Sequence, residues 1–524
     1  MPTTMTRRNF IIGSAVAVSA GAATALGSLS ARSGASRAAA GETTPTPTPT
    51  PAPTALPGYP ALVSRPDLSG APAARVLAST GRAQSGYLFA TPDVSDSVRG
   101  PCIFANDGSL LFYHPVTADL AHNFQVVEYQ GQSMLAWYEG AAIATYGEGA
   151  YYLYDNEYQQ VAVIQGENGS PIDLHELVVT PEGTALVGAY IPVEQDLTAI
   201  GGLATALVYD YRLQEIDIAS GRLLFDWHAL DHVPLTESAV PVPTDAGDDF
   251  DYFHGNAIDV TPDGGHLVLS ARNTSTVYKI DRQTGDIVWR FRGADDGKTP
   301  QDAITLSAPG ESFWFQHDVR AHVDGTFSLF DDGGEPFHHN ARGMLLSIDE
   351  DAGTGQIIRT DTVDIAVGYM GSYRSQANGD WLAGWGNVPR LTEFAASGDV
   401  VLDLEMSGYS YRALRYDWQS VPAAPPDIAA TRNGSGGLDV WASWNGATGV
   451  ASWRILAGPS ANALSPLQTF PLTGFETAMT VPTDLPVVAC EALDADGSSL
   501  GTSAPVTVPS LAAQGRAPMV TSSS

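Results

Sequence analysis

Short glycine turns, each leading into a β-type run, recur along this chain and constrain its fold more than any other feature. In each copy a polar residue and a glycine precede alternating apolar, β-branched or aromatic residues; the copies are residues 106–111, 181–187, 262–268, 324–329 and 378–382. Asn-Gly and Asp-Gly supply the positive φ of a tight hairpin, and the flanking residues favour strands. The copies lie roughly 45–80 residues apart, about the length of a four-stranded propeller blade with variable loops.

A second repeated phrase is a strand that ends in a glycine turn and returns as a second strand. It occurs at residues 216–225 and 280–289, with a weaker copy at 394–402. The roughly 345 residues from Arg75 to Val421 divide into about six blades of ~55–60 residues each. The sequence therefore predicts an all-β fold with a six-bladed β-propeller over residues 59–421. Closing the sheets into a ring leaves the short strands without exposed edges; a tandem of β-sandwiches is the alternative.

The residue pattern of the sequence changes after the proline-rich segment 422–426. Residues 437–444 and 451–457 alternate apolar with small or polar residues at strand periodicity. The length and pattern of residues 427–508 predict a small fibronectin type III-like β-sandwich, an accessory domain without catalytic residues. Residues 509–524 are expected to form a loose tail.

The N-terminal segment has the order of a twin-arginine export signal. Arg7 and Arg8 precede Phe10, a weakly apolar stretch from Ile11 to about Leu29, and small residues near Ala40. We expect residues 1–40 to be a signal peptide and residues 41–58 to be an extended Thr/Pro-rich linker. The protein is then extracellular or on the cell surface, with no integral membrane span in the mature chain. Whether the signal is cleaved or retained stays open.

Charge and cysteine content exclude several classes of function. The chain has 58 acidic against 26 basic residues and a net charge of −32, which argues against nucleic-acid partners and anionic membranes. Any anionic substrate must be held locally by Arg or His. Cys102 and Cys490 are far apart, so we expect neither a disulfide nor a cysteine metal site. The sequence says nothing of the oligomeric state.

Four segments place a histidine or an arginine where a predicted strand begins or ends. They carry His175, His254, Arg272 and His317. The three histidine segments each precede a turn–strand phrase, so the histidines are expected at equivalent places in successive blades, which converge on the central channel. The Arg272 segment follows such a phrase, and its guanidinium can meet the three imidazoles there. The other isolated histidines are expected to be surface or hydrogen-bonded residues: His114, His122, His228, His232, His266 and His322.

The order and spacing of these segments resemble the bacterial aryl sulfotransferases. The matching phrases are Asp-x-His-Glu ending at Glu176, His-x-Asn-x-Ile starting at His254 with Ser-x-Arg about 18 residues later, and Gln-His at His317 leading to Leu-Phe-Asp-Asp-Gly at 329–333. The resemblance covers the predicted propeller and not the sandwich. It implies a six-bladed propeller and a transferase that needs neither a nucleotide sulfate donor nor another cofactor.

Carried over residue by residue, the resemblance implies that His317 is the nucleophile. A phenolic sulfate ester gives its sulfuryl group to this histidine, and an acceptor phenol takes it up, in a ping-pong mechanism through a sulfohistidine. His254, Arg272 and His175 match the other catalytic positions, and Asn256 matches a neighbouring substrate contact. The chain departs from better-known members at Asp318, where a small or hydroxyl residue is usual, so the effect of this carboxylate on the imidazole is open.

The chemistry of the transfer suits these residue types. The three oxygens of a sulfate monoester share negative charge while the S–O bond breaks, so cationic donors must surround them. Arg272 keeps its charge and can bind two oxygens at once, and neutral imidazole is a good nucleophile. His254 or His175 could stabilise the oxygens or exchange a proton with the phenol.

Further candidates and competing functions remain open at this point. Arg342 either lines the channel or pairs with a carboxylate, and Tyr373 either stacks on an aryl ring or belongs to the core. His338 and His339 lie near Asp331 and Asp332 in sequence, but adjacent loop histidines are usually incidental, so no metal site is predicted. The alternative function is a non-catalytic propeller that binds a ligand or glycan. A quinone-dependent propeller dehydrogenase is disfavoured because the regular Trp docking signature is absent.

Overall fold

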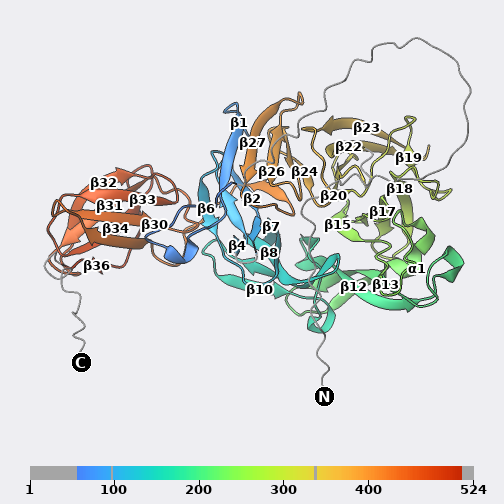
Figure 1. Cartoon of the computed structure of the whole chain (residues 1–524), viewed down its shortest axis with the longest axis horizontal. Helices are drawn as coiled ribbons and strands as arrows, with labels where there is room; N and C mark the ends of the chain where they lie inside the picture. Colours follow the sequence, from blue (N-terminus) through green and yellow to red (C-terminus); the bar gives the residue numbers. More distant parts are fainter. Residues whose placement is uncertain (1–55, 96–97, 335–338, 510–524) are drawn as a thin grey trace, which may run out of the picture. The chain divides into compact units, whose positions relative to one another are not determined.

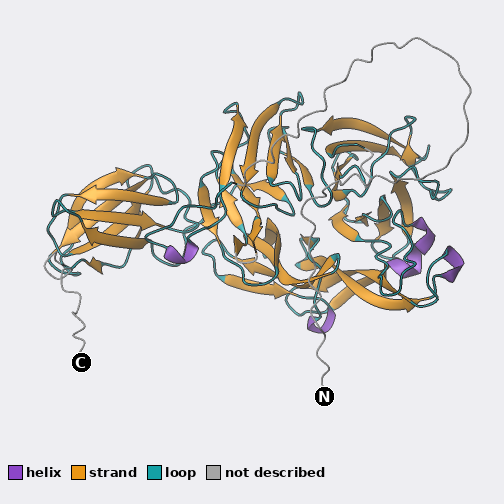
Figure 2. Ribbon diagram, in the orientation of Figure 1, coloured by secondary structure: helices purple, strands orange, loops and turns teal. Residues whose placement is uncertain are grey.

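The structure, a computed structural model, describes residues 56–95, 98–334 and 339–509. The predicted signal peptide, most of the linker, nearly all of the predicted tail and His338 lie outside the described residues. The prediction of an all-β fold is confirmed: strands dominate, and the described helices are single turns (Figure 2). These helices are η1 (Pro66–Leu68), η2 (Glu167–Gly169), η3 (Thr198–Ile200), α1 (Ala229–His232) and η4 (Leu235–Glu237). Among the described residues no helix has the length and apolar character needed to cross a bilayer.

Residues 74–416 form six sheets of four or five strands each within the described part of the chain (Figure 1). The first three sheets are each built from consecutive strands. The first contains β7 (Leu120–Tyr129), β8 (Gln132–Ile143), β9 (Tyr146–Tyr154) and β10 (Gln160–Ile164). The second contains β11 (Leu177–Val179), β12 (Thr184–Gln195), β13 (Ala206–Asp217) and β14 (Leu223–His228). The third contains β15 (Gly255–Val260), β16 (His266–Ala271), β17 (Thr276–Asp281) and β18 (Ile287–Arg292).

The other three sheets each combine consecutive strands with one strand from elsewhere in the chain. The fourth contains β20 (His317–Ala321), β21 (Phe327–Asp331), β22 (Arg342–Asp349), β23 (Thr354–Asp361) and β19 (Thr305–Leu306). The fifth contains β24 (Ser372–Ser375), β25 (Trp381–Gly384), β26 (Arg390–Phe394), β27 (Val400–Met406) and β1 (Ala74–Ser79). The sixth contains β28 (Ala413–Tyr416), β2 (Tyr87–Ala90), β5 (Cys102–Phe104) and β6 (Leu110–Tyr113). A separate short ribbon pairs β3 (Asp93–Ser95) with β4 (Val98–Arg99).

One edge strand of each sheet contacts the corresponding strand of the next sheet in a closed cycle. The cycle runs β7, β11, β15, β20, β24, β28 and back to β7. Both ends of the segment close it, because β1 pairs with β27 and β2 pairs with β28. We call these six the inner strands. Because they follow one another around the ring, residues at equivalent places on them come together.

Apolar side chains fill the space between neighbouring sheets. Leu213 of β13 and Leu269 of β16 belong to one buried cluster, and Val268 of β16 and Leu346 of β22 belong to another. Strand β16 therefore presents one face to each of its neighbouring sheets, as expected when sheets pack face to face.

Residues 427–507 form two further sheets. One contains β29 (Asp427–Arg432), β30 (Leu438–Ser443) and β33 (Glu476–Val481). The other contains β31 (Ser452–Gly458), β32 (Ser465–Pro471), β34 (Val487–Leu493), β35 (Ser499–Thr502) and β36 (Val506–Thr507). Val440 and Trp453, one from each sheet, share a buried cluster. The fibronectin type III-like assignment stays a prediction.

Candidate functional site

The beginnings of the inner strands carry the residues that the sequence singled out. His175 lies two residues before β11, His254 directly precedes β15, and His317 is the first residue of β20. Arg272 directly follows β16, and its backbone N–H donates to the His254 carbonyl at 2.9 Å. Because these inner strands are neighbours, the ring brings the three histidines and the arginine to one end of its inner surface.

The backbone is irregular at these strand ends and changes the direction in which their side chains point. His254 and Asp318 both adopt φ +56°, in the left-handed region that residues other than glycine rarely occupy. The pairing register shifts between Gly255 and Ala257 and again between His317 and Arg320. Such bulges are typical of sites where a side chain must point out of the regular pleat, and the strain is held by the surrounding sheet.

His175 and His254 form a pair, with ring centroids 4.8 Å apart. Each ring is anchored through Nδ1 by a buried carboxylate: His175 contacts Asp173 Oδ2 at 2.5 Å, and His254 contacts Asp251 Oδ2 at 2.5 Å. Burial opposes ionisation of Asp173 and Asp251, but the neighbouring histidines outweigh it and lower the pKa of both carboxyl groups. With Nδ1–H donated to a carboxylate, Nε2 of each ring is left to face a substrate.

His317 is the most enclosed of the three, with 2% of its surface exposed. Its Nδ1 donates to the Phe315 carbonyl at 3.0 Å and lies 3.1 Å from Asp332 Oδ2. Burial, and after it the positive charge of Arg272, holds the pKa of His317 well below its ordinary value. The imidazole is therefore neutral at physiological pH, and its Nε2 carries the free lone pair that a nucleophile needs.

Arg272 keeps its positive charge available. Its guanidinium carbon lies 4.5 Å from the centre of the Phe315 ring, and its donors reach Asn273 Oδ1 at 2.8 Å and the Gly368 carbonyl at 3.3 Å. Within the described ranges no carboxylate forms an ion pair with it. A cation that is half-buried and lacks a counter-ion is suited to hold an anionic group.

Tyr411 connects the histidines and was not singled out by the sequence. Its buried ring lies 5.6 Å from His175 and 6.4 Å from His317, centre to centre, and its hydroxyl donates to the Asn256 carbonyl at 3.0 Å. It lies two residues before β28, whose sequence has no histidine and no glycine-turn phrase close by. Only the ring closure reveals its position.

The expectation that His122 is a surface or hydrogen-bonded residue is wrong. His122, in inner strand β7, is 2% exposed, and neither of its ring nitrogens has a hydrogen-bond partner among the described residues. It stacks on Tyr411 at 5.7 Å, and burial, followed by the charge of His175, lowers its pKa to about 3. A signal was present: the Gln130–Gly131 turn follows His122 at the spacing seen after His175, His254 and His317.

Asp318, the departure from the family pattern, is neutralised by arginines. Its carboxylate accepts bonds from Arg374 at 2.6 and 2.7 Å and from Arg320 at 2.9 Å, and lies 3.2 Å from Nε of Arg412. Burial disfavours the charged form, but these arginines outweigh it and hold the pKa of Asp318 well below its ordinary value. Glu176 belongs to the same network through Arg320 and Arg412. These residues hold the inner strands together beneath the histidines.

The three predicted substrate contacts have different positions. Asn256 lies in the cluster: its Nδ2 donates to the Gln316 carbonyl at 2.8 Å, and its Oδ1 has no partner in the described structure. Arg342 pairs with the Asp331 carboxylate at 3.0 Å, as in the alternative that it pairs with a carboxylate instead of lining the channel. Tyr373 is packed against Trp381 at 4.6 Å and bonded to the Asp361 carboxylate, so its ring is not brought to the histidines. The described residues contain no group of three side chains that could hold a metal ion.

The strands and the site together define an all-β, propeller-like protein with histidines and an uncompensated arginine at one end of the ring. Residues 125–407, more than half of the chain, match the sequence model of the arylsulfotransferase (ASST) family. The chain belongs to this family. The match includes His175, His254, Arg272 and His317 but neither Tyr411 nor the C-terminal sheets, and membership indicates a transferase for small aryl substrates.

Two solved structures are distantly similar to the chain. A protein of unknown function from Bacteroides caccae is 12% identical, with a TM-score of 0.38, over 63% of this chain and 98% of that chain. A periplasmic gluconolactonase from Pseudomonas aeruginosa is 14% identical, with a TM-score of 0.35, over 76% of this chain and 99% of that chain. Likenesses at this level carry no argument about function. No curated protein matches the chain significantly.

Proposed function

We propose that the chain is a six-bladed β-propeller that transfers a sulfuryl group from a phenolic sulfate ester to an acceptor phenol by a ping-pong mechanism. The observation that carries the proposal is the orientation of His317: Nδ1 donates to the Phe315 carbonyl, so Nε2 bears the lone pair beside Arg272. The six sheets and the closed cycle of inner strands support the six-bladed fold. The family match supports the reaction class.

In the first half-reaction Nε2 of His317 attacks the sulfur. An N–S bond forms, the S–O bond to the aryl group breaks, and phenoxide departs. Arg272 balances the charge that the three sulfuryl oxygens share in the transition state. The imidazole ring gains positive character, which its Nδ1–H shares with the Phe315 carbonyl and the nearby Asp332 carboxyl group.

In the second half-reaction the acceptor phenol attacks the sulfohistidine. A new S–O bond forms, the N–S bond breaks, and the phenol proton passes to Nε2 of His254. Asp251, 2.5 Å from Nδ1 of that ring, stabilises the resulting imidazolium. His254 then returns the proton to solvent or to the next departing phenoxide. His175 and its Asp173 form the same kind of pair and bind the oxygens from the other side.

The proposal is tested with a chromogenic aryl sulfate, with and without an added phenol. We expect release of the chromophore that depends on the acceptor, together with sulfation of that phenol. Rapid quenching without acceptor should give a peptide that contains His317 and carries one sulfuryl group. His317→Asn should abolish both signals, whereas His266→Asn, in β16, should not. Failure of the folded wild-type protein to release phenol or to become labelled would contradict the proposal.

A non-catalytic propeller that binds a ligand is the second candidate. The low exposure of the site favours it: His175 and His254 are each 6% exposed, so an aryl ring can enter only if side chains move. In that case His317→Asn would leave ligand binding intact and no turnover would be found in the wild type.

We also propose export by the twin-arginine pathway and an accessory role for a fibronectin type III-like domain at residues 427–508. The Arg7–Arg8 pair and the two C-terminal sheets support these assignments. Replacing both arginines by lysine should abolish export of the full chain in a host that has the pathway. Export that persists would contradict the assignment.

A further inference from the structure

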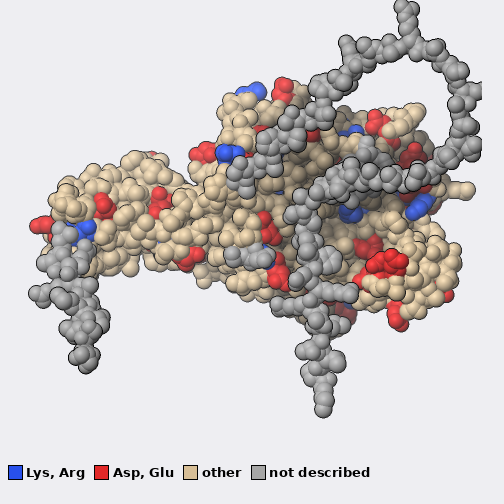
Figure 3. Space-filling view, in the orientation of Figure 1, with Lys and Arg blue, Asp and Glu red and all other residues tan. Residues whose placement is uncertain are grey.

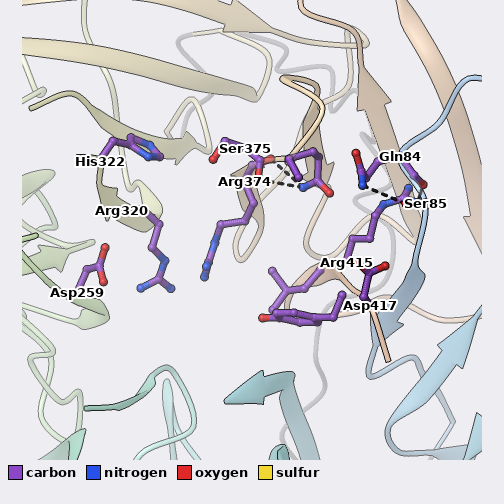
Figure 4. Close-up of a pocket in the computed structure, with 13 residues that line it drawn as sticks. Gln84, Ser85, Asp259, Arg320, His322, Arg374, Ser375, Arg415 and Asp417 are labelled. Carbon is purple, nitrogen blue, oxygen red and sulfur yellow. Dashed lines mark hydrogen bonds between the residues drawn. The ribbon is translucent and has the colours of Figure 1, made fainter. Parts of the chain in front are cut away.

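A second polar site lies at the opposite ends of the inner strands. The cavity has a volume of about 420 Å³ and is lined by Asp259 near the end of β15, Arg320 of β20, Arg374 of β24 and Arg415 of β28, among others (Figure 4). His317 begins β20, whereas Arg320 lies near its end. The cavity is therefore distinct from the histidine cluster, although the same strands build both.

The arginines of this cavity are held in place by buried acceptors. Arg374 places Nε and Nη2 on the Asp318 carboxylate, and Arg415 places Nη2 on Glu393 at 2.7 Å. Arg320 bonds Glu176 and Asp318. In Figure 4 the Arg320 and Arg374 side chains run side by side in the same direction. Three guanidinium groups are thus held in fixed positions around one space, which lowers the ordering cost of binding a ligand there.

Several buried nitrogen atoms at this cavity have no partner within the described structure. Nε of Arg320, Nε of Arg415 and Nε2 of His322 are buried and lack a hydrogen bond in the described structure. Arg320 is 8% exposed, and the side chain of Arg415 is 2% exposed. A guanidinium N–H can only donate, and a buried donor without an acceptor is costly. The missing acceptors are those that a ligand with oxygen atoms would supply.

We propose that this cavity binds the oxyanion group of a small polar molecule: a sulfate, phosphate or carboxylate. Unpaired guanidinium donors exclude a cation and disfavour an apolar group. The carboxylate of Asp259 accepts from the backbone N–H groups of Val260 and Ala321, so its oxygens are already engaged. Asp417 also lines the cavity, and its negative charge limits how much negative charge on a ligand the cavity accepts.

The net charge makes a local site necessary. The chain carries a net charge of −32, and the charged side chains visible on the face shown in Figure 3 are mostly acidic. Such a field repels anions at long range, so binding must depend on the converging arginines and should weaken with added salt.

Calorimetric titration of the full-length protein with sodium sulfate, phosphate and acetate, at constant ionic strength set with chloride, tests the proposal. We expect saturable binding of at least one of these oxyanions and none of chloride. Ser375→Glu puts a negative charge into the cavity without altering the arginine network, and it should weaken binding by about tenfold or more. Ser499→Glu, exposed in β35, is the matched control and should bind as the wild type does. Arg374→Gln should also weaken binding.

The histidine cluster is a second place where an anion could bind, so the two sites must be told apart. His317→Asn and Arg272→Gln should leave this binding unchanged, and crystals soaked in selenate should show the anion between Arg320 and Arg374. The proposal is overturned if none of the oxyanions binds, if Ser375→Glu has no effect, or if Arg272→Gln abolishes the binding. These outcomes are independent of whether the protein transfers sulfuryl groups.

Discussion

Nδ1 of His317 lies 3.1 Å from Oδ2 of Asp332, and neither oxygen of that carboxyl group has a hydrogen-bond partner among the described residues. Burial raises the pKa of Asp332 well above its ordinary value, although the charge of Arg272 opposes this. The protonated form of Asp332 is therefore favoured far more than it is in an exposed aspartate. In the proposed mechanism, positive charge on His317 would favour ionisation of this carboxyl group, which would then stabilise the imidazole ring.

Asp332→Asn should stabilise the fold at pH 7 and slow turnover. A carboxyl group whose pKa is higher in the folded than in the unfolded state destabilises the fold at pH values above its unfolded pKa, because it must take up a proton when the chain folds. We expect the free energy of unfolding of the variant to exceed that of the wild type by on the order of 1–3 kcal/mol at pH 7. Near pH 3 we expect no difference, because Asp332 of the wild type is then protonated in both the folded and the unfolded state. Chemical denaturation at both pH values measures this. An equal gain at both would show that the carboxyl is not protonated on folding.

The first half-reaction should keep its rate well into the acid range. Burial and Arg272 depress the pKa of His317, so the reactive neutral imidazole persists at pH values where an exposed histidine would be protonated. The pre-steady-state burst of phenol between pH 5 and pH 8 measures this. An acid limb centred near the ordinary histidine pKa of about 6.5 would contradict the burial of the nucleophile.

Arg272→Gln should lower kcat/KM by about 10²–10³-fold, because it removes the charge that faces the sulfuryl oxygens. Arg272→Lys should recover only part of the loss, since an ammonium cannot bind two oxygens side by side. Arg432→Gln, in β29, is the control for removing a positive charge. Activity near the wild-type level in Arg272→Gln would place the anion elsewhere.

Glu176→Gln should destabilise the fold by about 3–5 kcal/mol, because it removes one of the two buried carboxylates that neutralise Arg412 and Arg320. These arginines overcome burial and lower the pKa of Glu176. A group with a depressed folded pKa stabilises the protein above its unfolded pKa, and this contribution is lost as the pH falls through the folded pKa. The difference between wild type and variant should therefore shrink below about pH 4. Exposed Glu148→Gln should change stability little; a similar small change in Glu176→Gln would contradict this account.

His122→Phe should not destabilise the protein and is expected to stabilise it by about 1 kcal/mol. The substitution removes two buried ring nitrogens that have no partner and keeps the stacking on Tyr411. His122→Leu controls for overpacking by the larger ring. Urea unfolding curves of both variants measure the change. A loss of more than about 2 kcal/mol in both would show that these nitrogens make stabilising contacts.

The amino-acid sequence by itself determined that the fold is all-β and that the chain belongs to the arylsulfotransferase family. Glycine turns and period-two strands are local features, and the turn–strand phrases place His175, His254 and His317 at equivalent points of successive sheets. The same reasoning could have found His122, because the Gln130–Gly131 turn follows it at the same spacing.

Only the tertiary structure decided what surrounds those residues. Tyr411 meets His175 and His317 because β28 closes the ring, and no local pattern exists for contacts between residues so far apart in the chain. The ring also neutralises Asp318 with arginines from other strands and buries Tyr373 against Trp381. Local turns depend on neighbouring residues, whereas a side chain's partners depend on which distant strands become neighbours in the closed ring.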